Sequence, residues 1–448
     1  SIASGGNYNT VVGDEAGTAI TTGDNNVAVG YAALDAATTA SSNVAVGANV
    51  LTANTNGSSN TGIGNDALLS NTSGSYNVSV GAGTLDANVG GNFNTALGTS
   101  SLGANTSASN NTALGYSALT ANTTGTDNVA VGANALDANT TGGQNIVAGV
   151  NALGANTTGG QNTALGHRSL ATNTTASNNT AVGYNTLELN TTGASNTAIG
   201  RQALTANTTA SNNTAVGYAS LLANTTGEYN TAVGALAGDA ITTGPYNTAF
   251  GYLALSTETA GQESVAVGSQ ALATQNTSGG GAIYNTAVGT SAGRLITTGT
   301  NNTLMGGATG DAITTGSYNT AVGKDSLTAN TTAGYNTAVG YVSLRDNTTG
   351  ATNTAVGSSA LLQNTTGASN VGVGANALQA NTTATANAAL GYSALYTNTT
   401  GANNTALGFE ALALSTTASN NTAVGKDAMR ANTTGSQNVS VGTLSLAA

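Results

Sequence analysis

The sequence of 448 residues contains no cysteine and no tryptophan, a single proline and a single histidine, and only 6% charged residues. The lack of cysteine excludes disulfides, thiol nucleophiles and cysteine-bound zinc. Its 18 acidic residues outnumber the 7 basic ones, which disfavours a nucleic-acid partner because such proteins cluster Lys and Arg. No stretch approaches the roughly 18 consecutive apolar residues of a membrane-spanning helix, so we expect no membrane insertion.

Groups able to perform catalysis are equally sparse. The only histidine, His167, stands beside Arg168, and carboxylates such as Asp35, Asp86 and Asp137 occur singly. The sequence contains no cluster of acids in adjacent repeats of the kind that glycosidases use, no metal-ligand cluster and no phosphate-binding loop. We therefore expect a protein that is not an enzyme and that uses no cofactor and no metal.

The chain consists of a short repeat. A Gly that closes phrases such as N-T-A-V-G recurs every 17 residues from Gly13 to Gly268 and, after one step of 21, from Gly289 to Gly442, giving 26 copies. We number each copy 1–17, with this Gly at position 5. Positions 2–4 and 8–11 favour two short strands, and Gly at positions 5 and 15 favours tight corners. The prediction is an all-β chain, one continuous parallel β-solenoid over residues 1–448, with a four-residue insertion near 275–284 and incomplete terminal coils.

Positions 9 and 12 vary together. Position 9 is Leu in 21 copies, Met429 in one and Gly in four. Position 12 is Ile only in those four copies and is mostly Asn elsewhere. The four pairs are Gly17 with Ile20, Gly238 with Ile241, Gly293 with Ile296 and Gly310 with Ile313. A lost Leu matched by a gained Ile predicts that both positions reach one close-packed core. Position 10 varies among Thr, Asp, Arg, Glu and Tyr, so we expect it to face water.

Positions 1 and 3 are nearly constant. Position 1 is Asn in 25 copies, with Ser264 as the exception, which predicts a ladder of stacked amides. Position 3 is Ala in 19 copies and is never charged. If positions 2 and 4 face the core, position 3 faces outward, and a small apolar face then indicates contact with another chain. The alternative is a flat roll that buries both faces in its own core. The core and ladder residues that we select are Asn111, Leu114, Gly115, Leu119, Asn128, Val131, Gly132 and Leu136.

The phrases N-T-A-V-G, N-V-A-V-G and N-T-A-I-G resemble the head repeats of trimeric autotransporter adhesins, and similar runs occur in bacteriophage tail fibres. This resemblance implies a left-handed parallel β-roll with three chains side by side. The 17-residue unit is longer than the usual adhesin-head unit, and no heptad stalk or membrane anchor is visible, so a bare shaft or fibre is expected.

The sequence begins and ends inside a repeat, and its two ends together make a unit of 19 residues. We therefore expect subunits to stack head to tail, each completing a coil of the next, which gives an open filament. The alternative is that the ends are the boundaries of an ordered fragment. No leader opens the sequence, so Ser1 is expected to be a mature end if the protein is secreted. The residues expected at this contact are Ser1, Ile2, Tyr8, Asn438, Leu444, Leu446 and Ala448.

Three surface features leave alternatives open. Tyrosines recur at positions 6 and 17, where they could stack on glycans or another fibre, or pack over the glycine corners. Asn-Thr-Thr is a formal N-glycosylation acceptor, or else the chemistry of a turn. Threonine columns raise an ice-binding solenoid as a remote alternative, although Thr residues at positions 13 and 14 cannot both face outward from one strand.

The expected function is that of a structural subunit of an extracellular or cell-surface filament, with itself as partner through head-to-tail and lateral or trimeric contacts. The alternative is the shaft of a phage tail fibre or trimeric adhesin that takes part in attachment, with surface glycans as possible partners.

Overall fold

The computed structural model describes residues 6–277 and 279–447. All regular secondary structure in these residues is β-strand, and the strands pair in parallel. This confirms the predicted all-β, parallel solenoid fold. The chain divides into two arrays of coils, one up to Thr226 and one from Gly227, and each is described by itself.

In the first array, each coil contributes one three-residue strand at positions 2–4. These strands are β1 (Thr10–Val12), β2 (Val27–Val29), β3 (Val44–Val46), β4 (Thr61–Ile63), β5 (Val78–Val80), β6 (Thr95–Leu97), β7 (Thr112–Leu114), β8 (Val129–Val131), β9 (Ile146–Ala148), β10 (Thr163–Leu165), β11 (Thr180–Val182), β12 (Thr197–Ile199) and β13 (Thr214–Val216).

The second array repeats this pattern and adds two short strands. Its strands are β14 (Thr231–Val233), β15 (Thr248–Phe250), β16 (Gly261–Gln262), β17 (Val265–Val267), β18 (Gly281–Ala282), β19 (Thr286–Val288), β20 (Thr303–Met305), β21 (Thr320–Val322), β22 (Thr337–Val339), β23 (Thr354–Val356), β24 (Val371–Val373), β25 (Ala388–Leu390), β26 (Thr405–Leu407), β27 (Thr422–Val424) and β28 (Val439–Val441).

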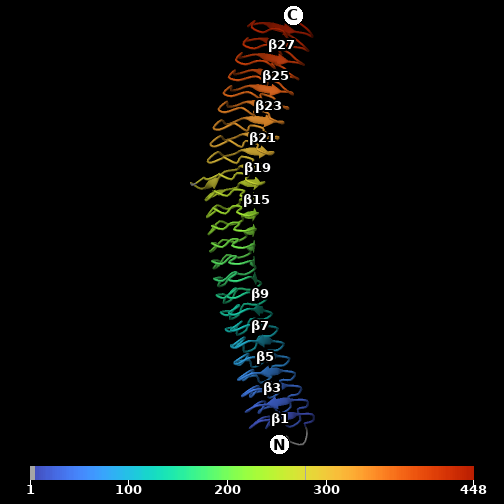
Figure 1. Ribbon diagram of the computed structural model, residues 1–448, viewed down its shortest axis with the longest axis vertical. Helices are drawn as coiled ribbons and strands as arrows, with labels where there is room; N and C mark the ends of the chain where they lie inside the picture. Colours follow the sequence, from blue (N-terminus) through green and yellow to red (C-terminus); the bar gives the residue numbers. More distant parts are fainter. Residues whose placement is uncertain (1–5, 278, 448) are drawn as a thin grey trace. The chain divides into compact units, whose positions relative to one another are not determined.

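Within each array, every strand pairs in register with the next copy of itself, as Figure 1 shows for the stacked arrows. Thr112 of β7 pairs with Val129 of β8, 17 residues later. Across the one longer repeat, Val265 of β17 pairs with Thr286 of β19, and the additional residues form β18, which pairs with β16. The insertion therefore leaves the main sheet in register.

Positions 8–11 are turns, so the prediction of a second strand in each coil is wrong. Positions 7 and 9 adopt left-handed backbone conformations, as at Ser117 (φ 54°) and Leu119 (φ 53°), and strands do not contain such residues. The segment still bonds from coil to coil, because the Leu119 N–H donates to the carbonyl of Ala135 at 3.0 Å. A left-handed position 9 also suits Gly, as at Gly310 (φ 57°).

The exchange of Leu for Gly and Ile is confirmed as a packing exchange. Ile296 and Ile313 are fully buried. A Cβ placed on Gly310 would lie 2.8 Å from Cδ1 of Ile313 and 3.0 Å from Leu304, so the space of the missing Leu is filled. Positions 9 and 12 therefore share one core volume, as their covariation predicts.

The orientation predicted for the first strand is reversed. Ala113 and Ala130 at position 3 are fully buried, whereas Leu114 and Val131 at position 4 are 42% and 36% exposed. Assigning Leu114 and Val131 to the core was therefore wrong, and so was the assignment of position 3 to contact with another chain. Position 3 is small because the strand packs onto the Leu stack of position 9, where Leu119 is 0% exposed. The alternative of a flat roll that buries both faces is correct for position 3, which faces the chain's own core, but not for position 4, which is partly exposed.

The glycine corner at position 5 is a close approach of coils. Gly115 has φ 142°, and a Cβ on it would lie 2.5 Å from the carbonyl oxygen of Gly132 in the next coil. No side chain fits there, which explains why Gly115 and Gly132 belong to an unbroken series.

Candidate functional site

The most regular feature of the interior is a ladder of asparagines at position 1. The Asn128 N–H donates to Oδ1 of Asn111 at 3.0 Å, and Nδ2 of Asn128 reaches the same oxygen at 3.2 Å. The second Nδ2 hydrogen goes to the carbonyl of Gly142 at 2.9 Å. Both asparagines are fully buried, so the ladder satisfies polar groups inside the core. The predicted amide ladder has this geometry.

A second ladder at position 12 was missed from the sequence. Nδ2 of Asn122 donates to Oδ1 of Asn105 at 3.3 Å and to the carbonyl of Gly125 at 3.0 Å. Asn122 begins an Asn-Thr-Thr acceptor sequence, yet it is fully buried and both of its amide hydrogens are used. In the folded array, this nitrogen is therefore closed to glycosylation. The predominance of Asn at position 12 was the signal that could have found this ladder.

The adjacent threonines divide between interior and surface. At position 13, Oγ1 of Thr123 donates to the carbonyl of Thr140 in the next coil at 3.0 Å. At position 14, Thr124 is exposed. The Asn-Thr-Thr phrase is thus a corner in which two residues bond from coil to coil and the third faces water.

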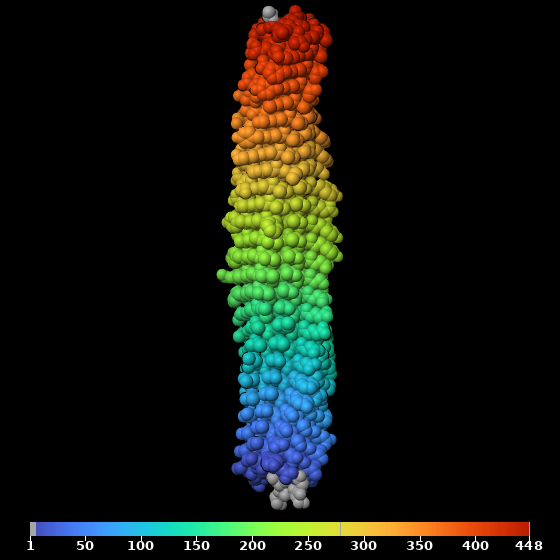
Figure 2. All heavy atoms as spheres, turned by 90° about the vertical axis from the view of Figure 1, so that its right-hand side faces the viewer, coloured from blue at the N-terminus to red at the C-terminus, as the bar shows by residue number. Residues whose placement is uncertain are grey.

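The outward side of the sheet is a regular, largely apolar surface in each array. Position 2 supplies mainly Thr and Val, and position 4 supplies Val, Leu and Ile. Figure 2 looks onto the strand side and shows rows of atoms that follow one another coil by coil within each array. The most exposed apolar side chains of position 4 in the first array are Val12, Ile63, Leu97, Leu114, Val131 and Ile199, and those in the second array include Phe250, Met305, Leu390, Leu407 and Val441.

Most position-10 side chains are half-buried, so the prediction that this position faces water holds only in part. Oγ1 of Thr120 donates to the Ser100 carbonyl, and Asp86 and Asp137 lie partly inside the turn segment. Burial raises the pKa of Asp86, Asp137 and Asp239 above the usual range for a carboxyl group. Among residues 6–277 and 279–447, no three His, Asp or Glu side chains come together in a way that could hold a metal ion.

Aromatic side chains form short columns along the surface. Tyr76 stacks on Phe93 with ring centroids 5.0 Å apart, and Tyr318 stacks on Tyr335 at the same distance. Each partner lies one coil away at the same position, so the rings face one another and present their edges to solvent. The partner covers one face of each ring, so a sugar could stack only on the other face.

No protein-family model matches this chain, and a search of curated proteins found no match either. The resemblance to adhesin heads and tail fibres therefore stands on the repeat phrases, and what the structure adds to it is the parallel β-solenoid itself. The described part of the chain contains no helix that is long and apolar enough to cross a bilayer.

The position-12 ladder contains a carboxylate at one place in the second array. Glu258 takes the place of Asn at position 12 and is fully buried. Its Oε1 accepts the N–H groups of Thr259 and Gly261 at 2.9 and 2.7 Å, and Nε2 of Gln275 donates to its Oε2 at 3.2 Å. The carboxylate is thus held by backbone and amide donors. This enclosed site is already filled by the chain's own side chain.

The residues expected to take part in assembly lie at both ends of the described chain. Ser1, Ile2 and Ala448 fall outside the described residues. Tyr8 is 87% exposed, and the Asn438 N–H continues the ladder by donating to Oδ1 of Asn421 at 2.9 Å.

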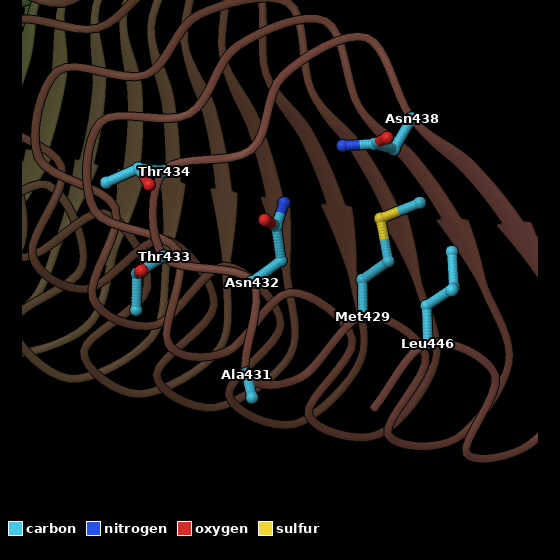
Figure 3. Close-up of a pocket in the computed structure, with 7 residues that line it drawn as sticks. All are labelled: Met429, Ala431, Asn432, Thr433, Thr434, Asn438 and Leu446. Carbon is cyan, nitrogen blue, oxygen red and sulfur yellow. The ribbon is translucent and has the colours of Figure 1, made fainter. Parts of the chain in front are cut away.

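The last coil is open on one side. Met429, Asn432 and Leu446 point into a pocket of about 300 Å³ there (Figure 3). Leu444 and Leu446 are 63% and 64% exposed, whereas Leu119 and Leu136 at the position of Leu446 in interior coils are fully buried. In interior coils, the groups equivalent to Leu446 and Asn438, such as Leu119 and Asn111, are buried.

Proposed function

We propose that the protein is a non-enzymatic structural element, the subunit or shaft of an extracellular or cell-surface fibre. The observation that carries this proposal is the coil-to-coil contact. Most coils offer the same two asparagine ladders and the same Leu stack to their neighbours, as Asn111 and Leu119 do to Asn128 and Leu136. A single coil buries too little apolar surface to fold alone, so the array is stabilised by contacts between stacked coils. Adding repeats to such a chain makes a longer array.

Stacking between chains would use the same contact. The open coil presents the Asn438 amide, the apolar side chains of Leu444 and Leu446, and the unpaired edge of β28. Parallel edges of this kind extend readily when a complementary coil is available. A coil supplied by another chain would cover these groups as the next coil does in the interior, and the product would be an open filament.

The surface available for side-by-side association is the outward face of the sheet at position 4, and not position 3 as expected from the sequence. Leu97, Leu114 and Val131 lie on consecutive outward strands and are 36–48% exposed. A continuous strip of such side chains favours association with a second surface. This strip supports the second candidate, the shaft of a trimeric adhesin or phage tail fibre, in which neighbouring chains would cover it.

The two contacts can be tested separately in the full-length chain. Leu97→Glu, Leu114→Glu and Val131→Glu together place charges on the outward sheet, and Leu444→Glu with Leu446→Glu places charges on the open coil. Particle mass by analytical ultracentrifugation and particle length by electron microscopy are measured at rising concentration. We expect the first set to remove side-by-side complexes and the second set to stop lengthening.

A matched control is Thr124→Glu with Thr141→Glu, which adds charge at exposed corners outside both surfaces. Circular dichroism reports whether the fold persists. Monomeric particles of constant length for the unmodified chain at every concentration would refute assembly through either surface.

A further inference from the structure

The charge of the first array changes sign along its length. Residues 6–137 carry eight carboxylates and neither Lys nor Arg, whereas residues 138–226 carry two arginines, the only histidine and one carboxylate. In a chain of net charge −11, this segment is locally basic. The basic side chains are His167, Arg168 and Arg201, at positions 6, 7 and 6 of their repeats.

Four side chains at position 6 of consecutive coils form one column in this segment. His167 stacks on Tyr184 with ring centroids 5.4 Å apart and an interplanar angle of 11°. The guanidinium carbon of Arg201 lies 6.0 Å from the ring centroid of Tyr184 and 5.9 Å from that of Tyr218. The guanidinium is therefore placed between two aromatic rings, and the column spans about 14 Å over three coil steps.

The two arginines differ in whether a nearby carboxylate compensates their charge. Arg168 pairs with Glu188 at 2.7 Å, with 48% of its own side chain exposed and only 12% of the Glu188 side chain. The carboxylate thus lies beneath the cation. Arg201 is exposed and has no carboxylate within ion-pair distance in the part of the chain that the structure describes. Its donors face solvent while the two rings limit its motion.

We propose that this strip, His167, Arg168, Tyr184, Arg201 and Tyr218, binds the oxyanions of an acidic polysaccharide. A guanidinium is a planar fork of donors that matches a carboxylate or sulfate group, and fixing it between two rings lowers the entropy lost on binding. Arg168 lies two coils away and is already paired with Glu188, so Arg201 supplies the principal contact to an oxyanion.

The test uses the full-length chain and isothermal titration calorimetry with three polymers. Polygalacturonate offers carboxylates, dextran sulfate offers sulfates, and dextran is neutral. We expect heat of binding with at least one acidic polymer and none with dextran, and the stronger of the two acidic polymers identifies the preferred oxyanion. Binding should weaken as salt is raised from 20 to about 200 mM because exposed charges are screened.

Variants separate this site from general electrostatics. Arg201→Gln should weaken binding by about tenfold or more, and Arg201→Lys should weaken it less, since it keeps the charge and loses the planar fork. Arg294→Gln is the matched control, because Arg294 already pairs with Asp311 at 2.8 and 3.0 Å in the second array. The absence of binding to both acidic polymers, or equal losses for Arg201→Gln and Arg294→Gln, would overturn the proposal. The measurement does not depend on fibre assembly, so it also stands if the proposed function fails.

Discussion

Oδ1 of Asn111 accepts two hydrogen bonds from Asn128, one from its backbone N–H at 3.0 Å and one from its side chain at 3.2 Å. The contact joins equivalent residues of neighbouring coils and is repeated through both arrays, as between Asn319 and Asn302. A buried amide is costly when unpaired, so this contact favours in-register stacking over any shifted arrangement. Register in such a chain is specified by the ladders as well as by the strands.

Removing one rung of the ladder should destabilise its neighbourhood. In Asn128→Ala, the Asn145 N–H loses its acceptor at 3.0 Å, whereas the Gly142 carbonyl keeps the donor of Asn139 at 2.9 Å. Leaving the buried Asn145 N–H without an acceptor costs about 1–3 kcal/mol. Asn65→Ala is the control, since Asn65 is exposed, and it should change stability by no more than about 0.5 kcal/mol. Amide hydrogen exchange of the surrounding coils measures the difference, and equal protection in the two variants would contradict it.

The fold class and the 17-residue period could be predicted from the sequence because every repeat carries nearly the same pattern of Asn, Gly and apolar residues. The covariation of Gly310 with Ile313 correctly identified a shared core volume, and the near-invariant Asn at position 1 correctly indicated a ladder. Both signals come from variation among copies within one chain. Variation of this kind reports what the interior tolerates.

The orientation of the first strand could not be read in the same way. Val and Leu at position 4 favoured a core assignment, yet Leu114 is exposed and Ala113 is buried. Hydrophobicity alone does not distinguish an apolar residue that contacts its own core from one on an outward sheet. The left-handed turn at Ser117 and Leu119 was also hidden, because Leu seldom adopts positive φ. Here the coil-to-coil hydrogen bonds hold that conformation.

Two leucines five residues apart give a direct test of the corrected orientation. Leu119→Ala removes a fully buried side chain and should cost about 2–5 kcal/mol. Leu114→Ala removes a side chain that is 42% exposed and should cost less than about 1 kcal/mol. Amide hydrogen exchange in the coils around each leucine compares the two variants, because a long array does not unfold in one step. A larger loss for Leu114→Ala would restore the orientation first expected.

Stability should depend on pH through the half-buried carboxylates of position 10. Oδ1 of Asp239 is buried without a hydrogen-bond partner among the described residues, and burial raises the pKa of this carboxyl. A raised folded pKa favours the protonated form, so the folded state gains stability below the unfolded pKa of about 3.9 and loses it as pH rises through the folded pKa. Asp239→Asn should therefore increase the free energy of unfolding at pH 7 by about 0.5 kcal/mol after allowance for solvent screening, and so raise the thermal midpoint at that pH. At pH 3 it should leave both unchanged. Thermal unfolding at both pH values measures this. An equal gain at pH 3 and pH 7 would show that ionisation is not the cause.

At the one repeat in which position 1 is not Asn, a neighbouring side chain compensates for the missing amide. Ser264 is shorter than the Asn it replaces, and Gln275 is longer than the Asn usual at position 12. Nε2 of Gln275 donates to Oγ of Ser264 at 2.9 Å, and its Oε1 accepts from Nδ2 of Asn285 at 2.9 Å. Gln275 thus carries the ladder across the gap that Ser264 leaves.

A double-mutant cycle measures this compensation. Gln275→Asn should cost about 1–3 kcal/mol, because the Asn285 amide and the Ser264 hydroxyl lose a buried partner. Ser264→Asn alone should also destabilise, by about 1–3 kcal/mol, because the larger side chain meets the long Gln275 in a packed core. The two changes together recreate the ordinary pair of asparagines and should cost less than either change alone. Amide hydrogen exchange in the coils around Asn285 gives the local free energies, since a long array does not unfold in one step. Additive losses in the double variant would mean that Gln275 and Ser264 act independently, and that the gap in the ladder is stabilised by the Glu258 contacts alone.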